Sequence, residues 1–226
     1  GTVPQAIIDA LQDAVEHALD NVPDFDTGTT THVAVDISGS MTAPITGNGK
    51  VPSKITCNQV AALVASAIKR KNKDVKTYQF DTECKEIVLN SRDSVMTNAK
   101  LLNKNGGGTD CASFIRLLNT KKAKGDLVVV LSDNMSWVDM HGRNYHKNTN
   151  ATSMANEWNL YKKSNPNAKL VCIDLTPNST TQVMSDKSVL NIGGFSDNVF
   201  SVIADFINGD GSADFWTKRI SETEIN

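Results

Sequence analysis

Oxygen-bearing side chains gather in three short segments, at residues 36–40, 106–110 and 132–133. The first reads Asp-Ile-Ser-Gly-Ser, the second Gly-Gly-Gly-Thr-Asp and the third Ser-Asp. The side chains that could hold a metal ion are two carboxylates and three hydroxyls, namely Asp36, Asp133, Ser38, Ser40 and Thr109. Because no histidine or cysteine lies among them, this all-oxygen set suits a hard cation and argues against zinc. Mg²⁺ is the first expectation, with Ca²⁺ or Mn²⁺ possible.

The elements that must position these segments alternate between strands and helices. Apolar runs predict strands at 32–37, 75–80, 86–89, 127–131, 170–173 and 189–192. Helical spacing of apolar residues predicts helices at 54–69, 94–102, 111–119, 154–163 and 199–207, and one after Pro4 from Ile7 to Leu19. This alternation predicts an α/β fold with one doubly wound, mostly parallel sheet flanked by helices. The three segments then converge, because functional loops in such sheets follow the carboxyl ends of the strands.

The five residues resemble the metal-ion-dependent adhesion site (MIDAS) of von Willebrand factor A domains. Asp-x-Ser-x-Ser alone is a weak signal, because short Ser/Asp loops often cap helices. The threonine loop and Asp133 follow it in the matching order. The resemblance extends from Thr31 to about Ile207 and implies a Rossmann-like A-domain fold. It further implies that the three hydroxyls bind the ion directly and that the two carboxylates act mainly through water.

The residues around these loops narrow the resemblance to the A-domain of Ro (TROVE-type) ribonucleoprotein autoantigens. The run Gly-Gly-Thr-Asp-Cys at 107–111 is the most telling, and similar stretches occupy 34–41, 80–81, 131–134 and 193–197. In that family the A-domain closes a ring of helical HEAT-like repeats that binds RNA. The resemblance therefore implies a component of a Ro-like RNA-binding ribonucleoprotein, with RNA bound through a ring absent from this chain. The segments 42–53 and 138–152 look longer and more polar than the family pattern, and both border the metal edge.

An ion held largely by neutral hydroxyls keeps much of its positive charge and favours an anionic oxygen at an open position. We therefore expect a metal-dependent protein-interaction domain whose partner supplies an acidic side chain, and not an enzyme. Two alternatives stay open: a free-standing bacterial or viral A-domain adhesion module unrelated to RNA, and a Mg²⁺-dependent phosphohydrolase. The second is weaker, since the sequence has no Walker loop, no dinucleotide-binding glycine motif and no nucleophile–base pairing. Asp110 could act as a base, but capping the following helix is the favoured role.

The 226 residues suit one large domain. We expect an N-terminal helix and linker over 1–30, the A-domain with its metal site over 31–207, and a polar C-terminal tail over 208–226. The chain does not begin with Met, which indicates either processing or excision from a longer protein. The resemblance favours an excised C-terminal domain.

Charge and composition exclude several other classes. Lys and Arg number 23 and Asp and Glu 25, giving a net charge of −2, so a global attraction to nucleic acid or to an anionic membrane is missing. The sequence has neither a long apolar run nor a signal-peptide pattern, and we expect no membrane partner. Basic clusters at 69–73, 121–124 and 162–163 each end a helix and precede a strand, which predicts a position opposite the metal edge. Complementing the helix ends is their favoured role, and a basic rim against RNA or the missing ring is the alternative.

Four widely spaced cysteines form no Cys-x-x-Cys pair: Cys57, Cys84, Cys111 and Cys172. We expect reduced, mostly buried thiols in a cytoplasmic protein rather than disulfides or zinc. A glycosylation sequon at 134–136 lies beside the predicted site, where a glycan would obstruct it, and this disfavours a secretory route. The polar segment containing His141 and His146 is expected to be a solvated loop, while His17 and His32 have no partner visible in the sequence.

Overall fold

A six-stranded sheet with the order β3-β2-β1-β4-β5-β6 organises the molecule. The computed structural model describes residues 13, 17, 19–22, 24–25, 28, 30–46, 53–133, 153–176, 186–196, 198–209 and 221. The strands are β1 (Thr31–Asp36), β2 (Val75–Phe80), β3 (Cys84–Ile87), β4 (Leu127–Ser132), β5 (Lys169–Asp174) and β6 (Val189–Gly193). All neighbouring pairs are parallel except β2 and β3, which form an antiparallel hairpin.

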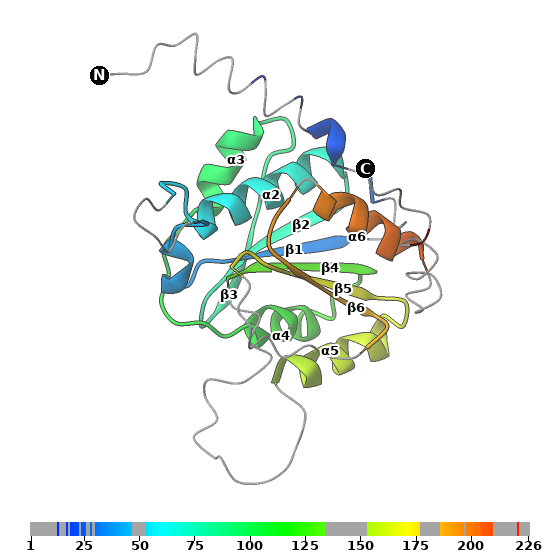
Figure 1. Ribbon diagram of the computed structural model, residues 1–226. Coiled ribbons are helices and arrows are strands. Elements are labelled where there is room, and N and C mark those ends of the chain that lie inside the picture. The colour runs from blue at the N-terminus through cyan, green and yellow to red at the C-terminus, as the bar shows by residue number, and fades with distance from the viewer. Residues whose placement is uncertain are drawn as a thin grey trace, which may run out of the picture.

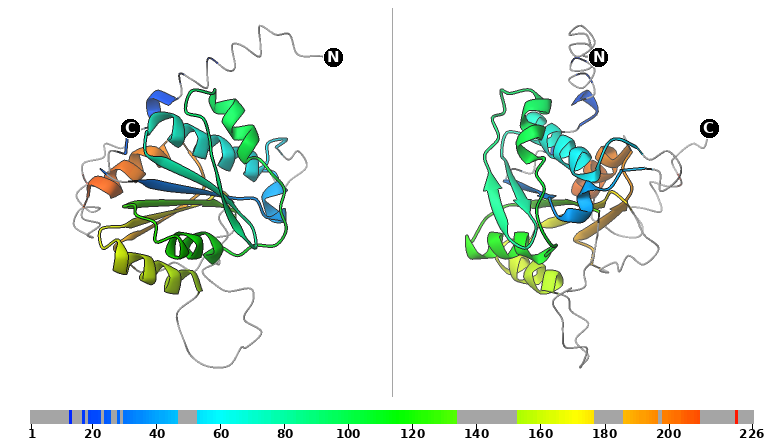
Figure 2. Two further views of the ribbon diagram at one scale, coloured as in Figure 1. Left: turned by 180° about the vertical axis from the view of Figure 1, so that it is seen from behind. Right: turned by 90° about the vertical axis from the view of Figure 1, so that its left-hand side faces the viewer.

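Helices cover both faces of this sheet (Figure 1). They are α2 (Cys57–Lys71), α3 (Val95–Leu102), α4 (Ala112–Thr120), α5 (Ser153–Ser164) and α6 (Asn198–Asn208), together with the short 3-10 helices η1 (Leu19–Asn21) and η2 (Gly39–Thr42). Two views at right angles show α2, α3 and α6 on one face and α4 and α5 on the other (Figure 2). The predicted doubly wound α/β fold is therefore confirmed.

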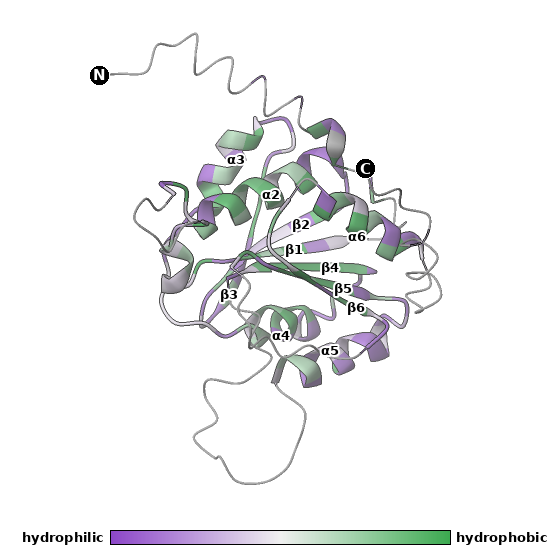
Figure 3. Cartoon of the chain, in the orientation of Figure 1, coloured by the Kyte–Doolittle hydropathy of each residue, from purple (hydrophilic) through white to green (hydrophobic). Residues whose placement is uncertain are grey.

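The central strands are buried because both of their faces are covered. Every residue of β1 and β4 is buried, and β4 is a run of aliphatic residues, as expected for a parallel strand between two helical layers. Figure 3 shows this hydrophobic strand between helices that carry hydrophilic residues. Val129 and Leu131 pack toward α2 and α6, whereas Val128 and Val130 pack toward α4 and α5. Successive side chains of a strand point to opposite faces of the sheet, so those of β4 belong to two separate cores.

The two cores are filled differently. On the α2 face, Ala61, Ala62 and Ala65 are completely buried, so small side chains bring the helix close to the sheet. On the opposite face the core is aromatic, and the rings of Trp158 and Tyr161 stack with their centroids 5.6 Å apart. Both helices, α2 and α5, are therefore packed tightly against the sheet.

The predicted elements over the described residues are confirmed, with one shift. β3 runs from Cys84 to Ile87 rather than over 86–89, because Phe80 pairs with Cys84 across a tight turn. Val88 therefore leaves the sheet and is 86% exposed. The predicted N-terminal helix and the polar tail lie almost entirely outside the described residues. Among the helices that the structure describes, none is long and apolar enough to cross a membrane.

His32 in β1 has partners that the sequence did not reveal. It is 1% exposed, its Nδ1 lies 3.0 Å from the Tyr78 hydroxyl, and its Nε2 lies 2.9 Å from the carbonyl oxygen of Lys124. Burial lowers the pKa of this imidazole, and the charge of Lys76 lowers it further, against the carbonyl of Lys124 and the charge of Glu86. The histidine is a neutral core residue that joins β1 to β2 and to the turn before β4.

This burial predicts a loss of stability in mild acid. Because the folded pKa of His32 lies below the unfolded value of 6.5, the unfolded chain binds the proton more readily below that pH. The stabilising contribution is complete above pH 6.5 and is lost as the pH falls toward the folded pKa, by less than about 1.4 kcal/mol per pH unit. Urea unfolding of wild type and His32→Gln at several pH values on either side of 6.5 measures the difference. His17→Gln, which changes an exposed histidine, is the control, and an equal pH dependence in wild type and His32→Gln would contradict the prediction.

Candidate metal centre

The predicted metal residues lie where the two central strands end. Asp36 is the last residue of β1, Ser38 and Ser40 lie in the turn that follows, and Asp133 comes directly after β4. Since β1 and β4 are neighbouring parallel strands, residues 97 positions apart in the chain reach one edge of the sheet.

Hydrogen bonds join four of the five predicted residues. The Ser38 amide donates to Asp36 Oδ1 over 2.8 Å, and the Ser40 hydroxyl donates to Asp133 Oδ1 over 3.0 Å. The hydroxyl oxygens of Ser38 and Ser40 are 3.2 Å apart. The two serines thus face one point, between the carboxylates of the two strands.

Thr109 reaches the same edge through the backbone of its loop. The amide of Gly39 donates to the carbonyl oxygen of Gly107 over 2.8 Å, and the amide of Gly106 donates to the carbonyl oxygen of Ile37 over 2.6 Å. These bonds place the glycine-rich segment against the first turn, with Thr109 half-buried two residues further along. Its side chain makes no hydrogen bond with the other four predicted residues, all of which the structure describes.

Two residues outside the five predicted ligands complete this edge. The Ser132 hydroxyl donates to Asp36 Oδ2 over 2.6 Å, so both oxygens of the buried Asp36 carboxylate accept hydrogen bonds. Asp174 ends β5 beside β4 and is also buried. Its position after an apolar strand was the available signal, because the carboxyl ends of parallel strands share an edge. Nothing in the sequence around Ser132 or Asp36 indicated that these two residues are in contact.

The carboxylates carry an electrostatic cost without a cation. Burial raises the pKa of Asp36, and the charge of Asp133 raises it further, against hydrogen bonds from Ser132 and Ser38. Burial likewise raises the pKa of Asp133, and burial and then the charge of Asp133 raise that of Asp174. Asp36 is 0% exposed and Asp133 is 8% exposed, so water relieves little of this repulsion. A bound cation would offset it.

The geometry of the oxygens fits a small hard ion. Two ligands at right angles on an ion with bonds of about 2.1 Å lie about 3.0 Å apart, close to the observed separation of the two serine hydroxyls. Within the described residues, no group of three or more His, Cys, Asp and Glu side chains could hold a metal. A centre here therefore depends on hydroxyl ligands, which favours Mg²⁺, Ca²⁺ or Mn²⁺.

The nearby thiols are poor ligands for a metal. Burial, together with the charges of nearby aspartates, raises the pKa of Cys57 to about 11 and that of Cys111 to about 12. Metals bind the thiolate, so these protonated sulfurs leave the site to oxygen. All four cysteines of the chain are described and are free thiols, with Cys57 and Cys172 buried and Cys84 and Cys111 half-buried.

Asp110 holds the start of α4. Its Oδ1 accepts from the amide of Ala112 over 3.0 Å, and its Oδ2 is 3.0 Å from the Arg116 guanidinium. These contacts support the capping role that the sequence favoured for Asp110. The sequon at 134–136, His141 and His146 all lie outside the described residues.

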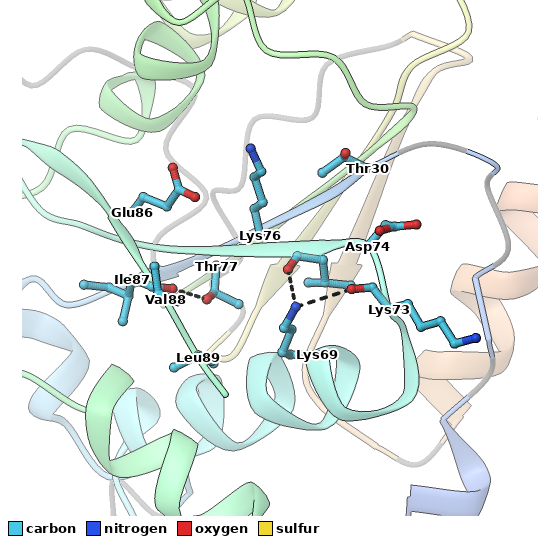
Figure 4. A pocket seen from close by; sticks show the side chains of 11 residues that line it. Thr30, Lys69, Lys73, Asp74, Lys76, Thr77, Glu86, Ile87, Val88 and Leu89 are labelled. Carbon is cyan, nitrogen blue, oxygen red and sulfur yellow. Dashed lines mark hydrogen bonds between the residues drawn. The ribbon is translucent and has the colours of Figure 1, made fainter. Parts of the chain in front are cut away.

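The opposite edge of the sheet holds a cavity of about 290 Å³ at the amino end of β2 (Figure 4). Lys69 projects into it from α2 and donates to the carbonyl oxygens of Lys73 and Val75 over 3.4 and 2.8 Å. On its wall, the Thr77 hydroxyl donates to the carbonyl oxygen of Ile87. These polar groups are bonded within the protein, so the cavity has fewer donors to offer a ligand than its lysines suggest.

The basic clusters lie at this edge, as predicted from their positions before β2, β4 and β5. Several of their cations make contacts within the protein, at exposed or half-buried positions. Lys121 is 3.0 Å from Glu86, Lys124 donates to the carbonyl oxygen of Ser164 over 2.6 Å, and Lys162 is 2.8 Å from Asp186. These contacts support the structural role over a basic rim for RNA.

The doubly wound α/β sheet, with Asp-x-Ser-x-Ser starting at the end of its first strand, is that of a von Willebrand factor A domain. The family model described as Ro60 vWA domain matches residues 30–207. The chain therefore belongs to the Ro60 vWA domain family.

One curated protein and one solved structure, both from Deinococcus radiodurans, are similar to this chain. The RNA-binding protein RO60 is 31% identical over 133 residues, which cover 58% of this chain and 24% of that protein. The crystal structure of the RO (RSR) protein matches with a TM-score of 0.69 and 25% identity, covering 92% of this chain and 39% of the solved one. The chain thus spans well under half the length of these relatives.

The cost of the buried carboxylates predicts that neutralising Asp133 stabilises the metal-free chain. Asp133→Asn keeps an oxygen that can accept from Ser40 but removes a buried charge, so we expect the melting temperature in excess chelator to rise by about 2 °C. Thermal unfolding followed by circular dichroism measures this. Asp110→Asn is the matched control, since Asp110 pairs with Arg116 and should gain nothing. A lower melting temperature for Asp133→Asn would show that the charge is not costly.

Proposed function

We propose that this chain is a metal-dependent protein-interaction domain of a Ro-like RNA-binding protein. Ser38, Ser40 and Thr109 would hold Mg²⁺ through their hydroxyls, with Ca²⁺ or Mn²⁺ as possible substitutes. Asp36 and Asp133 would act mainly through water. The observation that carries the proposal is the pair of serine hydroxyls 3.2 Å apart, between two buried carboxylates.

The ligand chemistry explains why such a site would bind a partner. Hydroxyl ligands are neutral, so a divalent ion keeps much of its charge, and magnesium retains exchangeable water. An acidic side chain of a protein partner is the anionic oxygen best suited to that open position. Both oxygens of Asp36 and one oxygen of Asp133 already accept protein hydrogen bonds, which favours a supporting role over proton transfer. We therefore propose binding and not catalysis.

RNA is proposed to bind elsewhere in the full-length protein. The similar RNA-binding protein of Deinococcus radiodurans is about four times as long as its matched region, so most of it has no counterpart in this chain. The net charge of −2 and the internal bonds of the opposite-edge lysines support this division. A helical-repeat ring outside this chain would hold the RNA. Family membership favours this role over a free-standing adhesion module, and the absence of disulfides among the four described cysteines supports a cytoplasmic location.

Calorimetric titration with Mg²⁺, Ca²⁺ and Mn²⁺ tests the metal site. Wild type should bind at one saturable site, and Ser40→Ala should weaken that binding at least about 10-fold, because it removes a hydroxyl that bridges Ser38 and Asp133. Thr120→Ala removes an exposed hydroxyl that bonds only within α4 and should bind like wild type. Wild type without saturable binding of any of the three ions would refute the proposal.

An acidic probe tests the open coordination position. A short fluorescent peptide of consecutive glutamates should bind in Mg²⁺ and dissociate on chelation, while the matching glutamine peptide should bind in neither condition. Fluorescence anisotropy measures both, and Ser40→Ala should abolish the magnesium-dependent signal. Glutamate binding that persists in chelator would point to a basic surface rather than to the metal.

A further inference from the structure

The carboxylate of Asp81, in the turn between β2 and β3, lies against the glycine-rich loop at 106–110. Oδ2 of Asp81 accepts from the amide of Gly107 over 3.1 Å, and Oδ1 accepts from the amide of Glu83 over 3.0 Å. The backbone carbonyl of Asp81 also accepts from the amide of Asp110 over 2.8 Å. One residue therefore holds both ends of the stretch that contains Thr109.

The same loop is bonded on its other side to the Asp-x-Ser-x-Ser turn. Gly106 donates to Ile37, and Gly107 accepts from Gly39, the residue between the two serines. Ile37 in turn donates from its amide to the carbonyl oxygen of Phe80, next to Asp81. The glycine-rich loop thus lies between Asp81 on one side and the serine turn on the other, and backbone hydrogen bonds hold it to both.

The packing at Gly106 shows how closely the carboxylate approaches. A Cβ atom at Gly106 would clash with Asp81 Oδ2 and would lie 3.0 Å from the carbonyl oxygen of Ile37. Any side chain here would therefore displace the Asp81 carboxylate or the serine turn. The amide of Glu83, and then that of Gly107, lower the pKa of Asp81, so the group stays an ionised acceptor despite partial burial.

We propose that Asp81 is a positioning residue of the metal centre. By holding the amide of Gly107, its carboxylate sets the place of Thr109 relative to Ser38 and Ser40 before any ion binds. The inference rests on the proposed function for its metal-binding part, and it adds a residue outside the five that would hold the ion or its waters.

Amide hydrogen exchange of the metal-free chain tests the positioning directly. In Asp81→Ala the amides of Gly107 and Asp110 and the neighbouring amide of Gly39 should exchange faster than in wild type. Asp81→Asn keeps one acceptor oxygen and should lie between the two. Asp93→Ala is the control, because Asp93 accepts from Asn90 in the connection between β3 and α3 and does not contact the loop. Unchanged exchange in Asp81→Ala would overturn the proposal whatever the metal affinity is.

Metal affinity supplies the second readout. Calorimetry with Mg²⁺ should show a loss of about 10-fold for Asp81→Ala, a smaller loss for Asp81→Asn and none for Asp93→Ala. Gly106→Ala, which would displace the Asp81 carboxylate or the serine turn, should produce both effects, and Asp81→Asn replaces Asp81→Ala if that variant does not fold. Faster exchange with unchanged affinity would overturn the role of Asp81 in the metal centre while leaving the proposed function intact. Wild type that binds no ion would overturn the proposed function together with this role.

Discussion

The metal edge depends on the burial of one carboxylate, that of Asp36. Its two oxygens accept from the Ser38 amide in its own turn and from the Ser132 hydroxyl on the neighbouring strand. A carboxylate removed from water is tolerated only when such donors surround it, so this single group binds the turn after β1 to the end of β4. Ser40 then meets Asp133 across the same gap. The arrangement of the whole centre follows from satisfying this buried charge.

Local sequence patterns predicted the helices and strands, because the apolar residues of a segment show which of its faces are buried. The five aliphatic residues 127–131 indicated a strand covered on both faces, and that is how β4 is packed. The Asp-x-Ser-x-Ser turn and its place at the end of a strand indicated that its side chains meet those of the other two segments at one edge. The parts that could not be predicted are contacts between distant segments. Ser132, Asp81 and the partners of His32 depend on strand register and turn shape, which no single stretch of sequence encodes. The early end of β3 likewise follows from its pairing with β2.

The two edges of the sheet have opposite chemistry, although the chain as a whole carries a charge of only −2. Aspartates gather where the parallel strands end, and lysines gather where they begin. The lysines serve helix ends and loop carbonyls, as Lys169 does by donating to three carbonyl groups at the end of α6. The aspartates instead face one another, and only hydroxyls and amides separate them. This contrast supports the proposal that the acidic edge, and not the basic one, takes up an ion.

The sequence separation within the centre has a consequence for folding. The bond between Ser132 and Asp36 closes a loop of 96 residues, so β1 must wait for β4 before its carboxylate has its second donor. Contacts of such long range form slowly, because the chain must first be brought together over that distance. A growing polypeptide therefore cannot present this centre until its middle strand has been made and has docked. Capture of an ion would report that the central sheet is complete, and would distinguish finished molecules from those still folding.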